Sequence, residues 1–258
     1  MKLLVSVSSV AEAEIALLGG ADIIDAKDPS VGALGAVGLD VFADIHAVVG
    51  ARRRISAALG DATGAAVVKR LASSYVARGA QIVKVGFAGV CDLVRVRELI
   101  ETAVSVSDAA SVVAVAYADA RAVGSIDARE LIEVAADAGA SGVLVDTVEK
   151  AGPGLTALWA DSELSSWIAR VHECGLFAAV AGKLQARDLA RVADLGADIA
   201  GVRGAACDGG RNGRVSRVLV QRLVEEVRAD RKESLSASRI SPAGMMNALT
   251  DGESAREK

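Results

Sequence analysis

Lysines and carboxylates carry most of the candidate chemistry in this sequence. Asp25 and Lys27 end one short apolar segment, Lys84 lies inside another, and Asp146 and Lys150 stand four residues apart at the end of a third. A lysine is almost never fully buried without a partner, so these positions indicate a cavity or ion pairs. Burial and a neighbouring ammonium group both lower a lysine pKa, which leaves a neutral amine that attacks carbonyl groups.

Lys27 is therefore the candidate nucleophile for a Schiff base. Asp25 lies two residues before it, and can orient the amine or carry protons to and from the imine. For each Asp and Lys pair, an ordinary structural salt bridge is the alternative. Tyr117 and Asp119 are further candidates near the same place, Tyr117 as a phenol donor or simply as a packing residue.

A second group of residues is typical of a phosphate-binding end. Gly182 and Lys183 follow one apolar segment, and Arg203 and Gly204 follow the next. Glycine lets backbone N–H groups approach an anion, and the two side chains add positive charge. Glycines at such ends also serve plain turns. The glycine- and arginine-rich loop 208–214 either contacts a second phosphate or leads into the last helix.

The elements that must position these residues alternate regularly along the chain. Eight short apolar or β-branched segments predict strands at 2–8, 23–27, 55–59, 82–87, 112–119, 142–147, 176–182 and 198–204. Helical spacing of apolar residues predicts helices at 10–18, 41–49, 67–77, 93–104, 128–136, 164–172, 186–195 and 215–227. Eight such units favour a single (β/α)8 barrel, with an open doubly wound sheet as the alternative.

The dipeptide Gly-Ala precedes every second predicted strand. It recurs at 20–21, 79–80, 139–140 and 196–197, where a helix would end with glycine as its cap. If the four strands start in one register, the residues four and six after the alanine share a face, because side chains alternate. Those residues are Asp25 and Lys27, Lys84 and Gly86, Leu144 and Asp146, and Gly201 and Arg203. We therefore expect the charged members to converge inside the barrel.

Composition excludes several classes of function. The formal net charge of −4 has no basic stretch that would indicate a nucleic-acid partner, and no long uncharged apolar segment predicts a membrane span. The chain holds only two histidines, both on predicted helices, which argues against a zinc site or a catalytic triad. No export signal is visible, so we expect a cytoplasmic protein. Self-association into a homo-oligomer is the general expectation for barrels.

The barrel is predicted to occupy residues 1–230 as one catalytic domain. From 231 to 258 the chain becomes polar and rich in serine and charge, which predicts a disordered tail.

Six motifs together carry a family resemblance: DAKDP at 25–29, GALG at 32–35, KVG at 84–86, YADA at 117–120, DT at 146–147 and GVRGAAC at 201–207. The sequence resembles the (5-formylfuran-3-yl)methyl phosphate synthase family of methanofuran biosynthesis, over about residues 2–227. The resemblance implies a TIM barrel and a carbon–oxygen lyase of one-carbon cofactor metabolism. Its implied reaction condenses two glyceraldehyde 3-phosphate molecules into a phosphorylated furan aldehyde, without a metal or organic cofactor.

Residue by residue, the resemblance gives Lys27 the Schiff-base role and Lys84 the transfer of protons. It places Asp25, Asp146 and Lys150 at further active-site positions. Two other functions fit the same residues. A class I aldolase acting on triose phosphates would use the same lysine, and a barrel without catalytic activity would merely bind a phosphorylated metabolite. A small-molecule substrate is expected under all three readings.

Overall fold

A closed barrel of parallel strands forms the centre of the molecule. The computed structural model describes residues 1–62 and 64–239, with side chains to residue 228. Each strand pairs with the next along the chain, and the last pairs with the first. The strands are β1 (Lys2–Val7), β2 (Ile23–Ala26), β3 (Arg54–Asp61), β4 (Ile82–Gly86), β5 (Ser111–Tyr117), β6 (Gly142–Asp146), β7 (Phe177–Val180) and β8 (Ile199–Val202). The predicted (β/α)8 barrel is confirmed.

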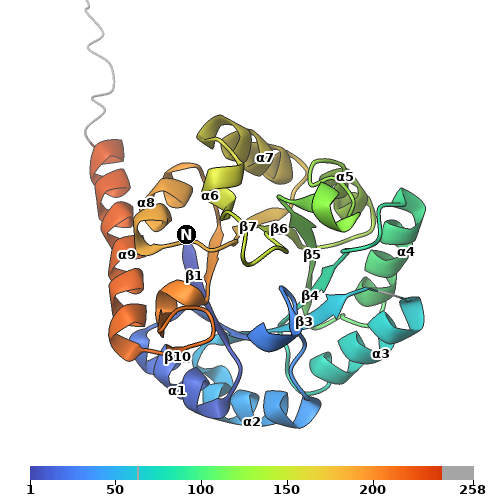
Figure 1. Ribbon diagram of the computed structural model, residues 1–258, viewed down its shortest axis with the longest axis horizontal. Coiled ribbons are helices and arrows are strands. Elements are labelled where there is room, and N and C mark those ends of the chain that lie inside the picture. The colour runs from blue at the N-terminus through green and yellow to red at the C-terminus, as the bar shows by residue number, and fades with distance from the viewer. Residues whose placement is uncertain (63, 240–258) are drawn as a thin grey trace, which may run out of the picture.

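A ring of helices surrounds the strands, as Figure 1 shows. The helices are α1 (Val10–Gly19), α2 (Leu39–Val49), α3 (Ala65–Val76), α4 (Leu93–Val104), α5 (Glu130–Asp137), α6 (Leu155–Leu158), α7 (Asp161–Glu173), α8 (Ala186–Asp194) and α9 (Arg217–Arg239). A larger core of Val, Ala, Leu and Ile fills the layer between strands and helices, and a smaller one lies inside the barrel. Such a two-sided burial explains why the strands are almost continuously apolar.

The Gly-Ala junctions end helices as expected. The four glycines Gly20, Gly79, Gly139 and Gly196 all have positive φ, between 79° and 96°. This left-handed conformation suits glycine, and it lets the chain leave the helix and turn into the following strand. Each junction therefore starts β2, β4, β6 or β8 in the same way, and the shared register follows from this common start.

Register places a polar row across the first three strands. Ser6 of β1 pairs with Asp25 of β2, and Asp25 pairs with Ser56 of β3. All three side chains are almost fully buried. Because residues paired between parallel strands point to the same face, the three side chains meet inside the barrel.

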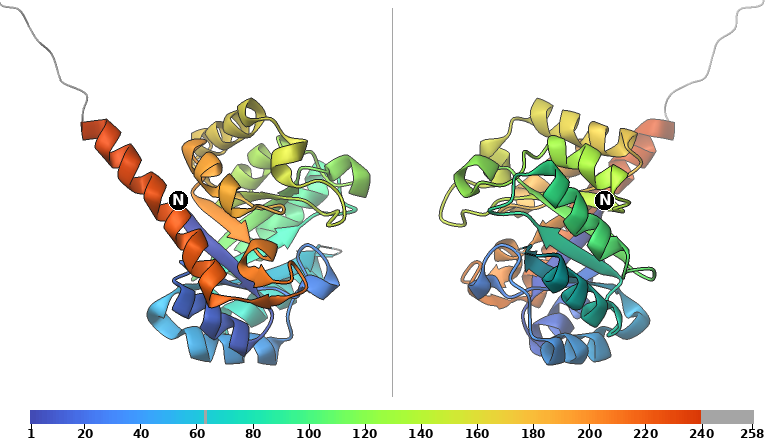
Figure 2. Two further views of the ribbon diagram at one scale, coloured as in Figure 1. Left: turned by 60° about the vertical axis from the view of Figure 1, so that its left-hand side comes forward. Right: turned by 90° about the vertical axis from the view of Figure 1, so that its right-hand side faces the viewer.

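Two features of the C-terminal part were not expected. A small antiparallel hairpin of β9 (Cys207–Asp208) and β10 (Arg214–Val215) precedes the last helix. The helix α9 then packs beside α1 and α8 and runs beyond the barrel wall (Figure 2). It continues to Arg239, past the predicted boundary at residue 230, where arginine, lysine and glutamate favour a helix. Residues 240–258 of the predicted tail lie outside the described residues.

Along the described part of the chain, no helix combines the length and the apolar character that crossing a membrane requires.

The close approach of α9 to α1 gives a test of the packing. A Cβ added to Gly19 would lie 2.5 Å from Cγ1 of Val220, which is fully buried. We expect Gly19→Ala to lower the free energy of unfolding by about 1–3 kcal/mol in urea denaturation, because an overpacked core must shift. Gly38→Ala is the control, since no atom lies within 4 Å of an added Cβ there. Equal stability of the two variants would contradict this packing.

Candidate active site

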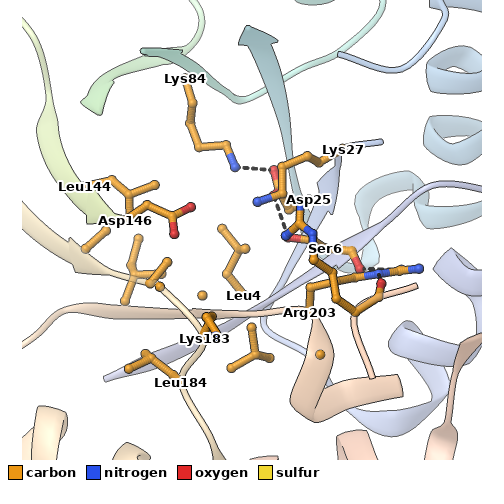
Figure 3. A pocket seen from close by; sticks show the side chains of 18 of the residues that line it. Leu4, Ser6, Asp25, Lys27, Lys84, Leu144, Asp146, Lys183, Leu184 and Arg203 are labelled. Carbon is orange, nitrogen blue, oxygen red and sulfur yellow. Dashed lines mark hydrogen bonds and ion pairs between the residues drawn. The ribbon is translucent and has the colours of Figure 1, made fainter. Parts of the chain in front are cut away.

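A cavity of about 250 Å³ runs from the C-terminal ends of the strands into the barrel. It gathers nine of the eleven residues that the sequence singled out, from five different strand ends: Asp25, Lys27, Lys84, Asp146, Lys150, Gly182, Lys183, Arg203 and Gly204. Tyr117 and Asp119 do not line it. The charged residues of the even-numbered strands therefore meet in one cavity, as expected. Figure 3 shows the labelled side chains that line it.

Asp25 is the centre of a buried hydrogen-bond cluster. Its Oδ1 accepts from Lys84 Nζ at 2.6 Å and from Ser56 Oγ at 2.6 Å, and its Oδ2 accepts from Ser6 Oγ at 2.9 Å. Burial alone would raise the pKa of the carboxyl, but the charges of Lys84 and Lys27 and these hydrogen bonds outweigh it and lower the pKa. Asp25 is thus a fixed carboxylate, fully removed from solvent.

Lys27 lies just after β2 and is 7% exposed, with its side chain at the cavity wall. Burial lowers the pKa of its amine to about 8. The carboxylates of Asp146 and Asp25 oppose this shift, while the ammonium groups of Lys84 and Lys150 add to it. The neutral amine of Lys27 is therefore far more populated near neutral pH than the neutral amine of a solvated lysine.

A second ion pair joins Asp146 and Lys150. Asp146 ends β6, and its Oδ1 accepts from Lys150 Nζ at 2.8 Å and from the backbone N–H of Thr147 at 2.7 Å. Lys150 Nζ also donates to the carbonyl and the hydroxyl of Thr147. Burial alone would raise the pKa of Asp146. The charges of Lys150 and Lys27 have a larger opposite effect, so the pKa is lowered overall. The pair places a second fixed carboxylate at the cavity.

The loop after β7 offers backbone donors to the cavity. Gly182 and Lys183 both have positive φ, 100° and 61°, and Lys183 is the one non-glycine residue with positive φ among the described residues. Within residues 1–62 and 64–239, the N–H groups of 182–184 have no protein acceptor. The Lys183 ammonium group donates to the carbonyl of Gly152. The loop thus has backbone N–H groups without a protein acceptor in the described part of the chain, and the Lys183 ammonium group keeps its charge and two further donors.

Arg203 is placed at the cavity but is already fully engaged. Both of its terminal nitrogens pair with the carboxylate of Glu12, at 2.6 and 2.9 Å. Its remaining N–H groups donate to the backbone carbonyls of Ser6, Gly213 and Arg211 at 3.0–3.2 Å. A guanidinium has five N–H donors, and all five are used here. This arrangement does not support the predicted phosphate contact by Arg203.

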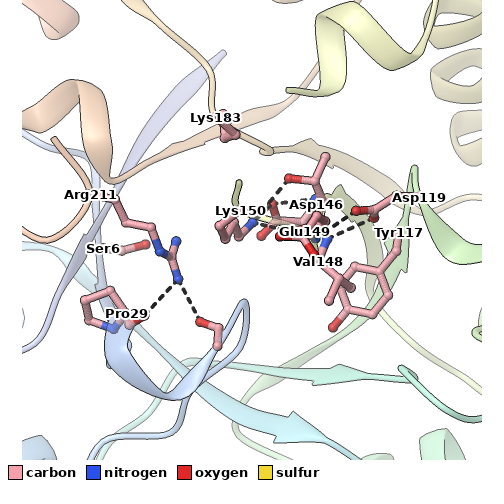
Figure 4. Close-up of polar contacts among 12 residues, drawn as sticks. Ser6, Pro29, Tyr117, Asp119, Asp146, Val148, Glu149, Lys150, Lys183 and Arg211 are labelled. Carbon is pink, nitrogen blue, oxygen red and sulfur yellow. Dashed lines mark hydrogen bonds and ion pairs between the residues drawn. The ribbon is translucent and has the colours of Figure 1, made fainter. Parts of the chain in front are cut away.

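Tyr117 and Asp119 lie outside the cavity and are both engaged in hydrogen bonds. The hydroxyl of Tyr117 donates to Asp61 Oδ1 at 2.6 Å, and burial followed by the charge of Asp61 raises the tyrosine pKa. Asp119 accepts from the backbone N–H groups of Val148 at 2.9 Å and Glu149 at 2.8 Å. Asp119 thereby shapes the loop that carries Lys150, as Figure 4 shows.

Three residues of the site were missed from the sequence. Ser6 and Ser56 looked like ordinary members of apolar strands, although the register that placed Asp25 also pairs it with both of them. Arg211 lines the cavity, and its Nη2 donates to the carbonyls of Pro29 at 3.2 Å and Gly32 at 2.8 Å. Its loop had been noted as glycine- and arginine-rich, but nothing in its spacing distinguished Arg211 from Arg214.

Comparisons with known proteins bear on this site. The sequence model of the 4-HFC-P synthase family matches residues 3–224. The chain belongs to this family. It is 39% identical to (5-formylfuran-3-yl)methyl phosphate synthase of Methanosarcina barkeri, covering 89% of this chain and all of that protein. The enzymes of the same name from Methanopyrus kandleri and Methanocaldococcus jannaschii are 40% and 37% identical, over 87% of this chain and 98% and 99% of theirs. The resemblance inferred from the motifs is confirmed, and the chain is a member of an enzyme family.

Solved structures with a similar fold are more distant in sequence. A 3-hexulose-6-phosphate synthase from Salmonella typhimurium has a TM-score of 0.62 and 18% identity, covering 89% of this chain and 100% of that one. An orotidine 5'-phosphate decarboxylase from Pyrococcus horikoshii has the same TM-score and identity, covering 88% and 99%. These similarities establish the fold alone.

The pKa of Lys27 predicts how its reactivity depends on pH. The neutral amine fraction should rise with a midpoint near pH 8, measured by reductive methylation followed by peptide mass mapping. Lys84→Met should move this midpoint upward, because it removes a repelling charge and leaves Asp25 to attract the Lys27 ammonium group. Lys69→Met, on the exposed face of α3, is the control and should change nothing. A midpoint near 10.5, or a downward shift in Lys84→Met, would contradict the electrostatics described here.

The serines around Asp25 give a stability test. Ser56→Ala removes a hydrogen bond to a buried carboxylate, and we expect it to lower the free energy of unfolding by roughly 1.5–3 kcal/mol near neutral pH. Ser107 is the matched control, because its buried hydroxyl has no hydrogen-bond partner in the described part of the chain. Ser107→Ala should therefore be neutral or slightly stabilising in the same denaturation assay. Similar costs for both variants would show that the bond from Ser56 adds nothing.

Proposed function

We propose that this protein condenses two glyceraldehyde 3-phosphate molecules into (5-formylfuran-3-yl)methyl phosphate through a Schiff base on Lys27. One observation carries the proposal: a buried lysine with a pKa of about 8 faces a cavity that also holds two fixed carboxylates. Membership of the 4-HFC-P synthase family supports the substrate and the product. The atoms balance when each product molecule formed is accompanied by one phosphate and two waters.

The neutral amine of Lys27 starts the reaction by attacking the carbonyl carbon of one triose phosphate. Loss of water then gives an iminium ion, which draws electrons from the neighbouring carbon and makes its proton easier to remove. The positive charge of the iminium forms among the carboxylates of Asp25 and Asp146, whose charges already act on the Lys27 amine. Fixed charges of this kind stabilise a developing charge without reorganising.

Lys84 is the group best placed to move protons near Asp25. Its Nζ is already hydrogen-bonded to that carboxylate, whose remaining hydrogen bonds come from the two serines. Asp25 therefore holds Lys84 in place rather than exchanging protons itself. Lys84 gives a proton to the hydroxyl that leaves as water when the iminium forms, and the neutral amine so produced takes the proton from the neighbouring carbon. The resulting enamine adds to the aldehyde carbon of the second triose phosphate. Hydrolysis of the iminium then breaks its bond to Lys27, and ring closure follows with loss of phosphate and water, so that two waters are released overall.

The loop after β7 supplies the phosphate contact in this proposal. Residues 182–184 line the cavity, their N–H groups have no acceptor within residues 1–62 and 64–239, and the positive φ of Gly182 turns the chain there. Backbone N–H groups held in a tight turn are well suited to bind an anion.

The proposal is tested by incubating the protein with glyceraldehyde 3-phosphate. We expect a furan chromophore and free phosphate in a ratio of one to one, and borohydride with substrate should attach a reduced adduct to Lys27 in peptide mass maps. Lys27→Arg should give neither the adduct nor the furan, because a guanidinium stays protonated.

Two results would overturn the proposal. A reversible aldol product without phosphate release would identify an aldolase instead. An adduct on a lysine other than Lys27, or continued furan formation in Lys27→Arg, would remove the assigned nucleophile. Lys69→Arg serves as the control, because this exposed lysine lies outside the cavity.

A further inference from the structure

The cavity contains an arginine, Arg211, that has no carboxylate partner among the described residues. Among the described residues, Arg211 forms no salt bridge, and only its Nη2 donates, to the carbonyls of Pro29 and Gly32. The N–H groups of its Nε and Nη1 have no protein acceptor within the described ranges, 1–62 and 64–239. Arg211 is half-buried, and burial lowers its pKa; the negative charge of Asp146 opposes this shift, and the positive charge of Arg203 adds to it.

Arg203 holds the loop that presents Arg211. Its Nε donates to the carbonyl of Arg211 itself, and its Nη2 donates to the carbonyl of Gly213 in the same loop. The backbone of Arg211 also lies close to Gly204, because a Cβ added to Gly204 would lie 3.4 Å from Arg211 N. The buried Arg203 and Glu12 pair therefore fixes the backbone from which the Arg211 side chain reaches the cavity.

The position of Arg211 connects two sides of the barrel mouth. Its chain segment follows β8, whereas the two carbonyls it contacts belong to the loop that directly follows Lys27. Figure 4 shows Arg211 on one side of the mouth, with Asp146 and Lys150 on the other. An anion bound by Arg211 would thus lie beside the loop that continues from the nucleophile.

We propose that Arg211 is a phosphate-binding residue of this cavity and that Arg203 is its positioning residue. A phosphate monoester is the ligand class that matches a half-buried guanidinium with unused N–H groups at the mouth of a cavity. This assignment rests on the proposed function for the identity of the substrate, a triose phosphate. It gives Arg211 the anion contact that the sequence had suggested for Arg203.

Binding of glycerol 3-phosphate tests the assignment without catalysis. This probe has the phosphate monoester of the substrate but no carbonyl group, so it cannot form an imine with Lys27. By titration calorimetry, we expect Arg211→Gln to weaken its binding roughly ten- to hundredfold, the loss for charge-assisted hydrogen bonds. Arg211→Lys keeps the charge and should retain most of the affinity. Arg214→Gln, an exposed residue of the same loop, should bind as the unaltered protein does.

A purely structural role for Arg211 predicts a different pattern. Arg211→Lys and Arg211→Gln would then lose affinity equally, because neither side chain reproduces the two carbonyl contacts, and that result would overturn the proposal. It also fails if Arg211→Gln binds glycerol 3-phosphate normally, or if the unaltered protein binds this probe no better than glycerol.

The positioning role of Arg203 has its own readout. Arg203→Met should weaken the binding of glycerol 3-phosphate when Arg211 is present but cause little further loss in Arg211→Gln, because it acts through Arg211. It should also lower the melting temperature, because it leaves the carboxylate of Glu12 buried without its partner, whereas Arg211→Gln should leave the melting temperature nearly unchanged. The reverse order of melting temperatures would overturn the division of roles.

These measurements separate the two proposals. If no furan forms but the binding pattern holds, the Arg211 assignment stands and the synthase reaction falls. If the furan forms and Arg211→Gln binds normally, the reverse applies.

Discussion

The ion pair between Lys84 and Asp25 is the constraint on which the rest of the site depends. Two charges removed from water cost several kcal/mol each unless their remaining hydrogen bonds are satisfied. Ser6 and Ser56 satisfy the carboxylate from the two neighbouring strands, at the positions that the parallel register pairs with Asp25. The barrel interior is consequently polar at this level, and most of the apolar core lies outside the strands, against the helices.

Three other cationic side chains of the site each form an ion pair with a carboxylate, which explains how the site can also hold a neutral amine. Lys84 is paired with Asp25, Lys150 with Asp146, and Arg203 with Glu12, all at 2.6–2.8 Å. Lys27 has no salt bridge among the described residues, so burial dominates and its pKa falls to about 8. The same carboxylates that hold the other cations limit this fall. The pKa of Lys27 thus stays close enough to neutral pH for both protonation states of the amine to be populated.

Much of the site could be predicted because it follows from local pattern. The Gly-Ala junctions fix where even-numbered strands begin, and counting from them placed Asp25, Lys84 and Asp146 in one cavity. The ion pair that Arg203 forms could not be predicted, because its partner Glu12 lies on α1, far away in the sequence. Arg211 was missed for a related reason: a glycine-rich loop has no periodicity, and the contacts that orient it come from other segments.

The contrast between fold and family shows where the function resides. Barrels with a TM-score of about 0.6 and under 20% identity share the strand order, which provides eight strand ends around one cavity. What a given chain does there depends on which strand ends carry charge and which carboxylate each cation receives. In this chain the carboxylate of Glu12 forms an ion pair with Arg203, and Arg211 of the neighbouring loop lines the cavity. Under the proposed roles of the two arginines, a change at Glu12 would therefore alter anion binding at the mouth through Arg203 and the loop that it holds.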